Sequence, residues 1–278
     1  MTERGTALGY EATRAGFQAA TTLALGEVQD YSLDMRRYPA LLFLLVSAVV
    51  AAAEPAAAKT TAADLVIKEG VETRIACDHN GGYSKYSGIY HYRVVLPKGY
   101  HGDATKTWPA IFVASPGGNA AMGNMADWIK KHGFIAIMLD ESRNGPWDPS
   151  VGNFLAANQD ASKRFRIGEG RKVCTGFSGG ARASSIFVSI GDNFGGVILQ
   201  GAGVGTLDNG IRGLHGVQIA AIAVTIGKKD PNRAEIAGMV RASQDDRLQV
   251  FEFEGGHQWA PKETIERALD YVAGKLPK

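Results

Sequence analysis

The sequence has little cysteine and no strongly charged segment, and each shortage excludes a class of function. Its two cysteines, Cys77 and Cys174, cannot supply a four-sulfur zinc site, so we expect no metal centre. Its 30 basic and 28 acidic residues are dispersed and leave a net charge of +2. Nucleic-acid-binding proteins need a clustered basic surface, so we expect no nucleic-acid partner.

The sequence also lacks an apolar run long enough to span a membrane. The run at residues 41–53 falls short of the roughly 20 residues that a transmembrane helix needs. It follows the basic pair Arg36 and Arg37 and ends in small residues before Glu54, which is the pattern of a secretory signal peptide. No cysteine follows this cleavage site, so a lipid anchor is not indicated. We expect a secreted or periplasmic protein without stable membrane insertion.

The predicted signal peptide begins inside the chain and divides it into four parts. Residues 1–34 carry no signal features and represent either read-through from an early start codon or an extended leader. Residues 35–53 form the signal peptide, and the Ala- and Thr-rich residues 54–63 form a flexible lead-in. Residues 64–278 have the length of a single α/β domain, and a hydrophobic content of 45% supplies a full core.

Strand-like and helix-like segments alternate along the predicted domain. We expect strands near residues 65–77, 88–96, 108–114, 133–140, 172–175, 196–200, 218–226 and 248–254. We expect helices near residues 121–132, 153–165, 181–187, 234–243 and 263–275. This alternation predicts a mostly parallel central sheet with helices on both faces.

A G-x-S-x-G motif follows the fifth of these strands and precedes a helix. Gly176 and Gly180 stand two positions before and after Ser178. In this context the chain reverses sharply, so that side chains are not tolerated at the two glycines and the serine is held in a strained conformation. The Ser178 hydroxyl is therefore a candidate nucleophile. The backbone N–H of Gly179 would point toward a developing oxyanion.

A serine nucleophile needs a general base and an acid that orients the base. Asp230 follows the apolar strand at residues 218–226, and His257 follows the strand at residues 248–254. Acid and base thus occur after the serine and just past strands, in the order typical of one hydrolase architecture. Asp208 is the alternative acid. The other histidines fit surface or packing positions, namely His79, His91, His101, His132 and His215.

The chain resembles the α/β-hydrolase superfamily, in particular its small secreted esterases and the relatives of polyhydroxybutyrate depolymerases and feruloyl esterases. The resemblance rests on residues 115–118, 142–147, 176–182, 227–230 and 256–257. It implies the α/β-hydrolase fold, with Ser178 as nucleophile, His257 as base and Asp230 as orienting acid.

The loop at residues 115–120 is the expected source of a second oxyanion donor. It follows the strand at residues 108–114, and its glycines allow close approach of backbone to substrate. Many members of the superfamily carry His-Gly where this chain has Pro116 and Gly117. By position, the resemblance then assigns the second donor to the N–H of Gly118, beside that of Gly179.

The connection at residues 201–217 is short and rich in glycine. A large lid does not fit there, so we expect an open site. The dinucleotide-binding pattern G-x-G-x-x-G fails in this segment because Thr206 stands at its last glycine. Trp147, in the loop after the strand at residues 133–140, and Trp259 are expected to contact the substrate. Ordinary packing is the alternative interpretation for both.

Taken together, these features predict a serine esterase that cleaves short acyl, aryl or polyester-type esters through an acyl-enzyme intermediate. An open cleft suits such small or polymeric substrates better than long acyl chains, which need a deep apolar tunnel. The alternatives are a serine peptidase or amidase of the same fold, and a non-catalytic binding protein that retains the fold. We expect a monomer without a cofactor. Whether Cys77 and Cys174 form a disulfide stays open.

Overall fold

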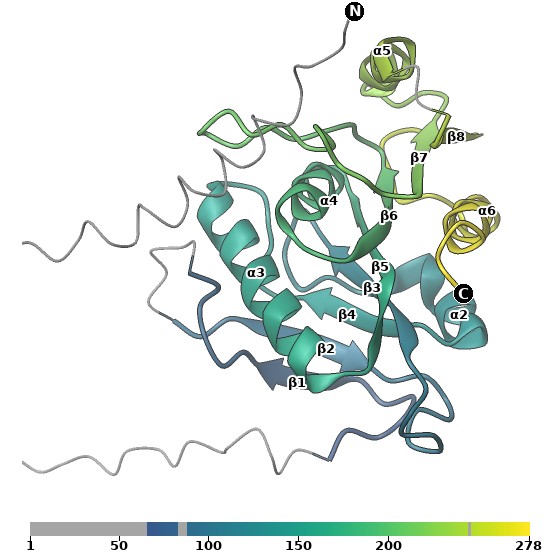
Figure 1. The fold of residues 1–278 in the computed structure, drawn as a ribbon. Coiled ribbons are helices and arrows are strands. Elements are labelled where there is room, and N and C mark those ends of the chain that lie inside the picture. The colour runs from purple at the N-terminus through teal and green to yellow at the C-terminus, as the bar shows by residue number, and fades with distance from the viewer. Residues whose placement is uncertain (1–65, 83–87, 244–245) are drawn as a thin grey trace, which may run out of the picture. The chain divides into compact units, whose positions relative to one another are not determined.

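The computed structural model describes residues 66–82, 88–243 and 246–278 (Figure 1). The chain separates into two units, Met1–Asp64 and Leu65–Lys278, and the second contains every described residue. The predicted leader at residues 1–34, the signal peptide at 35–53 and the lead-in at 54–63 therefore lie outside the described residues. In the part of the chain that is described, no helix has the length and apolar content needed to cross a membrane.

The second unit is built on an eight-stranded sheet with the strand order β1-β2-β4-β3-β5-β6-β7-β8. Strands β1 and β2 are antiparallel to their neighbours, and all pairs from β4–β3 onward are parallel. The strands are β1 (Thr73–Ala76), β2 (His91–Val95), β3 (Trp108–Ala114), β4 (Ile135–Leu139), β5 (Ile167–Phe177), β6 (Phe194–Gln200), β7 (Ala221–Gly227) and β8 (Leu248–Phe253).

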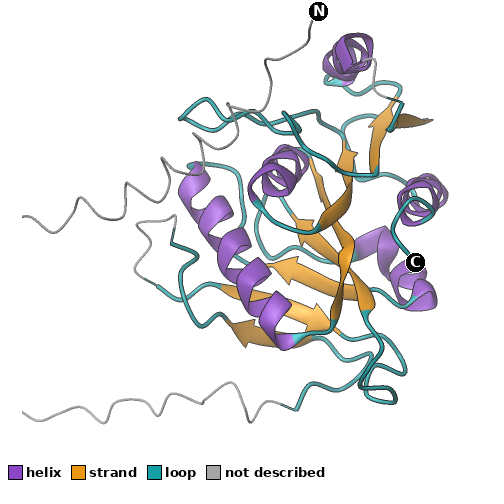
Figure 2. Ribbon diagram, in the orientation of Figure 1, coloured by secondary structure: helices purple, strands orange, loops and turns teal. Residues whose placement is uncertain are grey.

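Helices cover both faces of the sheet, as Figure 2 shows. Phe154 of α3 and Phe187 of α4 pack in one core layer, whereas Ile129 of α2 and Leu269 of α6 pack in the other. The helices are α2 (Ala126–His132), which follows the 3₁₀ turn η3 (Gly123–Met125), α3 (Trp147–Arg164), α4 (Gly179–Ile190), α5 (Arg233–Ser243) and α6 (Lys262–Ala273). The predicted mostly parallel sheet with helices on both faces is confirmed.

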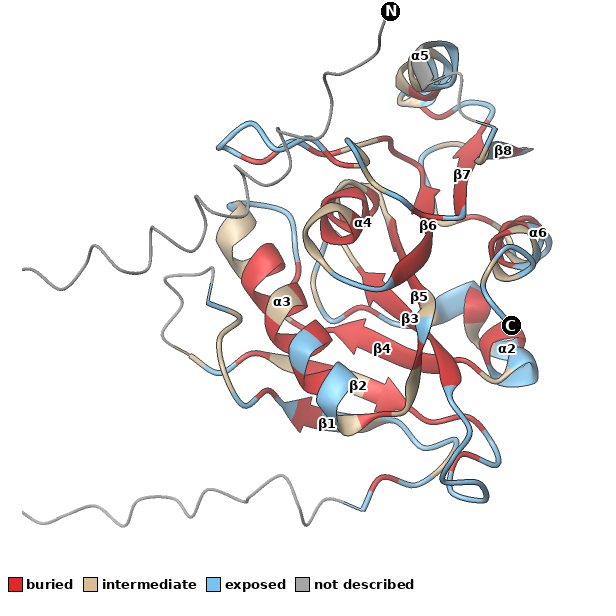
Figure 3. Cartoon of the chain, viewed as in Figure 1, coloured by how far each residue is buried: buried red, intermediate tan, exposed pale blue. Residues whose placement is uncertain are grey.

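The central strands are buried along their whole length (Figure 3). Strands β3, β4, β6 and β7 contain almost only apolar and small residues, as expected when helices cover both faces of a parallel sheet. The predicted bounds of β3 agree with the structure. Strand β1 is shorter than the predicted residues 65–77, and β5 is longer than residues 172–175.

Helix α3 begins at Trp147 rather than near residue 153, so the predicted loop position of Trp147 is wrong. Pro146 occupies the N-cap position of the helix, and Pro149 lies in its first turn. The first N–H groups of a helix have no intrahelical acceptor, so a proline there removes no hydrogen bond. The two prolines therefore mark the start of this helix and not a longer loop.

The two cysteines are free and buried. Cys174 lies inside β5, and Cys77 follows β1. The structure thus has no bridge between them.

Candidate active site

Ser178 lies in a sharp turn between β5 and α4. Its backbone has φ 54° and ψ −117°, a conformation that non-glycine residues rarely adopt. A Cβ built on Gly176 would come within 2.5 Å of the backbone of Gly180, and a Cβ on Gly180 would come within 2.5 Å of the carbonyl oxygen of Ala114. Both flanking positions therefore require glycine, and the turn is the strained elbow that the motif predicts.

The structure joins Ser178, His257 and Asp230 in one chain of hydrogen bonds. His257 Nε2 lies 2.9 Å from Ser178 Oγ, and His257 Nδ1 lies 2.9 Å from Asp230 Oδ2. A carboxylate only accepts, so Nδ1 carries the proton and Nε2 is left to accept from the serine hydroxyl. This tautomer is the one in which the imidazole can act as a base toward Ser178.

The Asp230 carboxylate is wholly buried, whereas the His257 side chain is 33% exposed. The second oxygen of Asp230 accepts the backbone N–H of Asn232 at 2.8 Å. The Asn232 amide in turn donates to the carbonyl of Gly201 at 2.8 Å. A Cβ on Gly201 would lie 2.7 Å from the Phe177 ring, so glycine there lets the acid and the ring pack closely. The acid is thus fixed in orientation and shielded from water.

The turns that carry Asp230 and His257 are joined by main-chain hydrogen bonds. The N–H of Lys228 donates to the carbonyl of Phe253, and the N–H of Lys229 donates to that of Gly255, each at 2.9 Å. A Cβ on Gly227 would lie 2.6 Å from the carbonyl oxygen of Gly255, so only glycine permits this approach. Asp230 and His257 therefore keep their relative position through main-chain contacts.

The alternative acid and the other histidines have different surroundings. Asp208 is exposed in the 201–217 connection, and the carboxylate partner of His257 is Asp230. The remaining histidines contact local groups: His79 with Gly81, His91 with Glu141, His101 with Ile67, His132 with Trp128, and His215 with Arg212 through its backbone N–H.

Gly179 is the first residue of α4, immediately after the nucleophile. The first N–H groups of a helix have no intrahelical acceptor and lie at the positive end of its dipole, which favours an anion. The predicted first oxyanion donor is therefore placed beside Ser178. The N–H of Gly118 instead donates to the carbonyl of Ser115 at 3.3 Å, in a turn where Gly118 has φ +75°. This turn bond must open before Gly118 can bind an oxyanion.

Asn144 is a site residue to which the sequence assigned no role. It lies after β4, in the 142–147 segment, and its N–H donates to the carbonyl of Pro116 at 2.8 Å. Its side-chain amide lies against Gly179: a Cβ built on Gly179 would be 1.6 Å from Asn144 Oδ1. The resemblance of residues 142–147 to hydrolase-like proteins was the only sequence signal for this contact.

Solved structures match this fold, although no protein-family model and no curated protein matches the sequence. A fluorophosphonate-binding serine hydrolase of Staphylococcus aureus superposes with a TM-score of 0.56 at 14% identity, over 74% of this chain and 99% of that one. A ferulic acid esterase superposes with a TM-score of 0.55 at 15% identity, over 75% and 99%. The chain has the α/β-hydrolase fold. An S-formylglutathione hydrolase of Staphylococcus aureus matches similarly, with a TM-score of 0.55 at 14% identity, over 75% and 99%.

In the α/β-hydrolase fold of this chain, an aromatic surface adjoins the base. The Phe177 ring lies 4.7 Å from the His257 ring and 5.3 Å from the Trp259 ring, centre to centre. Trp259 is half-buried. Trp147 instead packs against the 201–217 connection, where a Cβ on Gly205 would lie 2.9 Å from its ring. The structure thus places Trp259 against Phe177, which contacts His257, and Trp147 against the 201–217 connection.

The 201–217 connection is the place where lids commonly enter this fold. Among its residues, all of which the structure describes, there are turns and one short bridge from Thr206 to Arg212, and no helix. Arg182 of α4 holds the connection by donating to the carbonyl of Val204 at 3.2 Å. It also pairs in a bidentate manner with Glu235 of α5, at 2.7 Å for each bond. No lid covers Ser178 from this segment.

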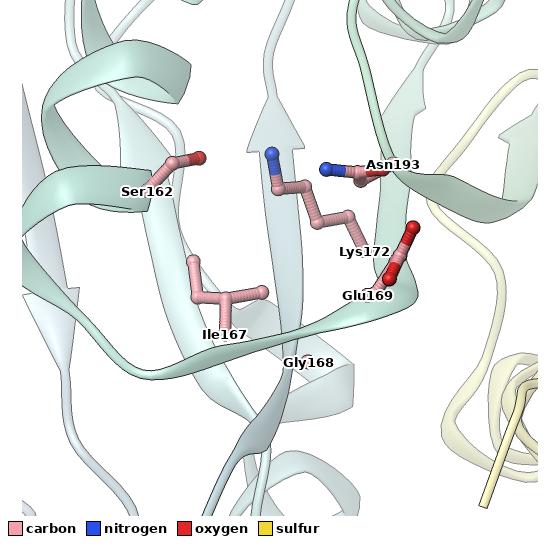
Figure 4. Close-up of a pocket in the computed structure, with 6 residues that line it drawn as sticks. All are labelled: Ser162, Ile167, Gly168, Glu169, Lys172 and Asn193. Atoms are coloured by element: carbon pink, nitrogen blue, oxygen red, sulfur yellow. The ribbon is translucent and has the colours of Figure 1, made fainter.

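A cavity of about 380 Å³ lies far from this chemistry, at the start of β5, whereas Ser178 follows the end of that strand (Figure 4). Its Lys172 ammonium donates to Asn158 at 2.9 Å and to the carbonyl of Asp192 at 3.3 Å, and burial lowers the pKa of this lysine. The lining residues are Ser162, Ile167, Gly168, Glu169, Lys172 and Asn193. Within the described residues, no three His, Cys, Asp or Glu side chains cluster so as to hold a metal ion.

Proposed function

We propose that this protein is a serine hydrolase that cleaves carboxylic esters through an acyl-enzyme intermediate. The observation that carries the proposal is the hydrogen-bonded chain from Ser178 Oγ through His257 to the buried Asp230. The strained elbow supports it, because backbone strain of this kind persists mainly at functional sites. The similar solved structures include a serine hydrolase and a ferulic acid esterase, which agrees with this chemistry.

The proposed mechanism assigns one group of the site to each step of ester hydrolysis. His257 Nε2 accepts the proton of Ser178 Oγ as the oxygen attacks the ester carbonyl carbon. Asp230 stabilises the imidazolium that results, and the N–H of Gly179 binds the negative oxygen of the tetrahedral intermediate. His257 then protonates the departing alcohol. Water, activated by the same base, hydrolyses the acyl-serine and restores the enzyme.

The surroundings of the triad favour short acyl, aryl or polyester-type substrates. The Phe177 and Trp259 rings offer an aromatic contact surface beside His257. The short 201–217 connection leaves the site open, so an extended polymer or an aryl group can reach Ser178. A long acyl chain would lack the enclosed apolar tunnel that it needs. Trp147 packs against this connection, and we propose that any contact it makes with substrate is secondary to this packing.

We also propose that the protein is exported from the cytoplasm. The signal peptide at residues 35–53 would be removed, and the protein would act in the periplasm or outside the cell. This processing leaves intact the compact unit Leu65–Lys278 that carries the triad.

The alternatives receive less support. A peptidase or amidase uses the same triad but must also protonate a poor amine leaving group, and no described contact is specific to that task. A non-catalytic binding protein would not explain the strained backbone of Ser178 or the hydrogen bond between Ser178 and His257.

The test is a panel of nitrophenyl esters with acetyl, butyryl, octanoyl and palmitoyl chains, run beside a peptide anilide. We expect turnover of the short esters and covalent labelling of Ser178 by a fluorophosphonate, mapped by mass spectrometry. Ser178→Ala should abolish both. His257→Ala should lower kcat by about 10⁶-fold and Asp230→Ala by about 10⁴-fold, as in triads that act as a unit. Labelling of Ser115 or Ser184 instead would overturn the assignment.

A further inference from the structure

We propose that the side-chain amide of Asn144 is the second oxyanion donor of this site and works together with the N–H of Gly179. The inference rests on the proposed esterase function and adds a catalytic residue to it. In this assignment the N–H of Gly118 keeps its turn bond to Ser115 and does not bind the oxyanion.

The position of the amide carries the proposal. A Cβ built on Gly179 would lie 1.6 Å from Oδ1, 2.7 Å from Cγ and 3.2 Å from Nδ2 of Asn144. The amide thus occupies the space that a side chain at position 179 would fill. The Cα of Gly179 is bonded directly to the nitrogen that donates to the oxyanion. An oxygen bound to that N–H therefore lies next to the Asn144 amide.

The amide is available to donate, and the neighbouring backbone groups are not. Among the described residues, no group forms a hydrogen bond with the Asn144 side chain, which is exposed. Its oxygen and nitrogen exchange places by a half-turn about the last side-chain bond, so an anion selects the NH₂ end.

The backbone groups of the neighbouring loop at residues 116–118 are not free to donate. Pro116 has no N–H. The N–H of Gly117 lies 3.4 Å from Ser115 Oγ, and that of Gly118 donates to the Ser115 carbonyl at 3.3 Å.

The backbone under Asn144 is held in place before any substrate binds. Asn144 itself donates its N–H to the carbonyl of Pro116. The N–H of the preceding residue, Arg143, donates to the Ser150 hydroxyl at 3.1 Å, and that hydroxyl donates to the Arg143 carbonyl at 2.8 Å. The buried Asn153 amide oxygen accepts the N–H groups of Glu141 and Ser142, each at 3.0 Å. A donor on a fixed backbone needs little reorganisation when charge develops, which is the condition for strong transition-state stabilisation.

This assignment also explains the glycine at position 179. Gly179 has no positive φ, so its backbone conformation does not require glycine. A larger side chain would displace the Asn144 amide and leave the N–H in place. Glycine at position 179 thus leaves room for the Asn144 amide.

The first experiment compares Asn144→Ala, Asn144→Asp and the wild type on nitrophenyl acetate. We expect Asn144→Ala to lower kcat by about 10²–10³-fold with KM nearly unchanged, as for loss of one oxyanion donor. Asn144→Asp should be worse, because its carboxylate repels the oxyanion. Binding of phenylboronic acid, whose serine adduct mimics the tetrahedral intermediate, should weaken in parallel with kcat. Arg143→Ala, on the same segment and with no described side-chain partner, is the matched control and should keep kcat.

The second experiment is a double-mutant cycle with Gly179→Ala. The added methyl group displaces the amide, so Gly179→Ala should lose about as much kcat as Asn144→Ala, and the double variant should lose no more. Three results would each overturn the inference. One is a double variant whose loss of kcat is the product of the two single losses, and another is a fully active Gly179→Ala variant. The third is an Asn144→Ala variant whose kcat stays within about threefold of wild type, since an oxyanion donor is expected to contribute far more. Thermal unfolding confirms that each variant is folded.

The two proposals can fail separately. A wild-type protein that neither turns over esters nor reacts with a fluorophosphonate would remove the esterase function and this inference with it. A wild type that is active and labelled at Ser178, together with an unaffected Asn144→Ala, would remove the Asn144 role alone.

Discussion

The backbone of Ser178 is held at φ 54° and ψ −117° by the glycines and strands around it. Such conformations cost about 1–3 kcal/mol and are relieved by glycine, which has no Cβ. We therefore expect Ser178→Gly to be more stable than Ser178→Ala by about 1 kcal/mol, although both lack the nucleophile. Urea unfolding of the two inactive variants measures the difference. Equal stabilities would show that the elbow carries no strain at this residue.

The buried thiols of Cys77 and Cys174 allow a second residue-scale prediction. Burial disfavours the charged thiolate and raises the pKa of both groups above the usual value. Below those raised pKa values the thiols stay protonated, and the thiolate is the reactive form. We expect no reaction with Ellman's reagent at mildly alkaline pH in the folded protein and two reactive thiols in urea. Rapid labelling without denaturant would show that one of the cysteines is exposed.

At the scale of elements, the two tryptophans should separate binding from stability. Trp147 begins α3 and packs against the 201–217 connection and the core, but it is only half-buried, so Trp147→Ala should lower the free energy of unfolding by roughly 3 kcal/mol, the low end of the range for a tryptophan. The Trp259 ring is tilted against Phe177, which in turn contacts His257, so Trp259→Ala should raise KM for phenyl esters by about 2- to 10-fold, the effect of losing one aromatic contact. Aliphatic acetyl esters serve as the comparison substrate.

The opposite pattern would reverse these roles. If Trp147→Ala raised KM and left stability unchanged, the ring would be chiefly a substrate contact, which is what the sequence predicts.

The sequence was enough to predict those features whose local pattern matches their place in the fold. Strand β3 was predicted with its observed bounds because residues 108–114 form an apolar run that ends at a glycine-rich loop. Ser178, Asp230 and His257 follow strands, and parallel strands end at a common edge of the sheet, so order alone brought them together.

Other features had no local signal. The first half of β5 contains Glu169, Arg171 and Lys172, which do not resemble a buried strand, and its pairing with β3 and β6 is tertiary. The contact of Asn144 with Gly179 joins the loop after β4 to the start of α4, which are distant in sequence, and a polar loop residue carries no periodic pattern. The register of such loops is decided by packing and main-chain hydrogen bonds.

For the whole molecule, the proposed export makes a direct prediction. Expression in a bacterial host should yield a mature protein in the periplasm or medium that begins between about Glu54 and Lys59, by the small-residue cleavage rule. N-terminal sequencing measures this end. Removal of residues 1–53 should not affect activity, because the triad lies within Leu65–Lys278. An active, uncleaved protein that begins at Met1 in the cytoplasm would contradict the signal peptide.

The proposed triad of Ser178, His257 and Asp230 is assembled from distant parts of the chain, and this determines when activity can arise. His257 Nε2 and Ser178 Oγ meet across 79 positions of sequence, and β8, which delivers His257, is the edge strand next to the C-terminus. A ribosome makes Ser178 well before the base that activates it, so a nascent chain remains catalytically silent until β8 joins the sheet. In refolding from urea, recovery of ester turnover should therefore lag behind the recovery of the helical circular dichroism signal. Ester turnover would then report the pairing of β8 with the sheet, which brings His257 to Ser178.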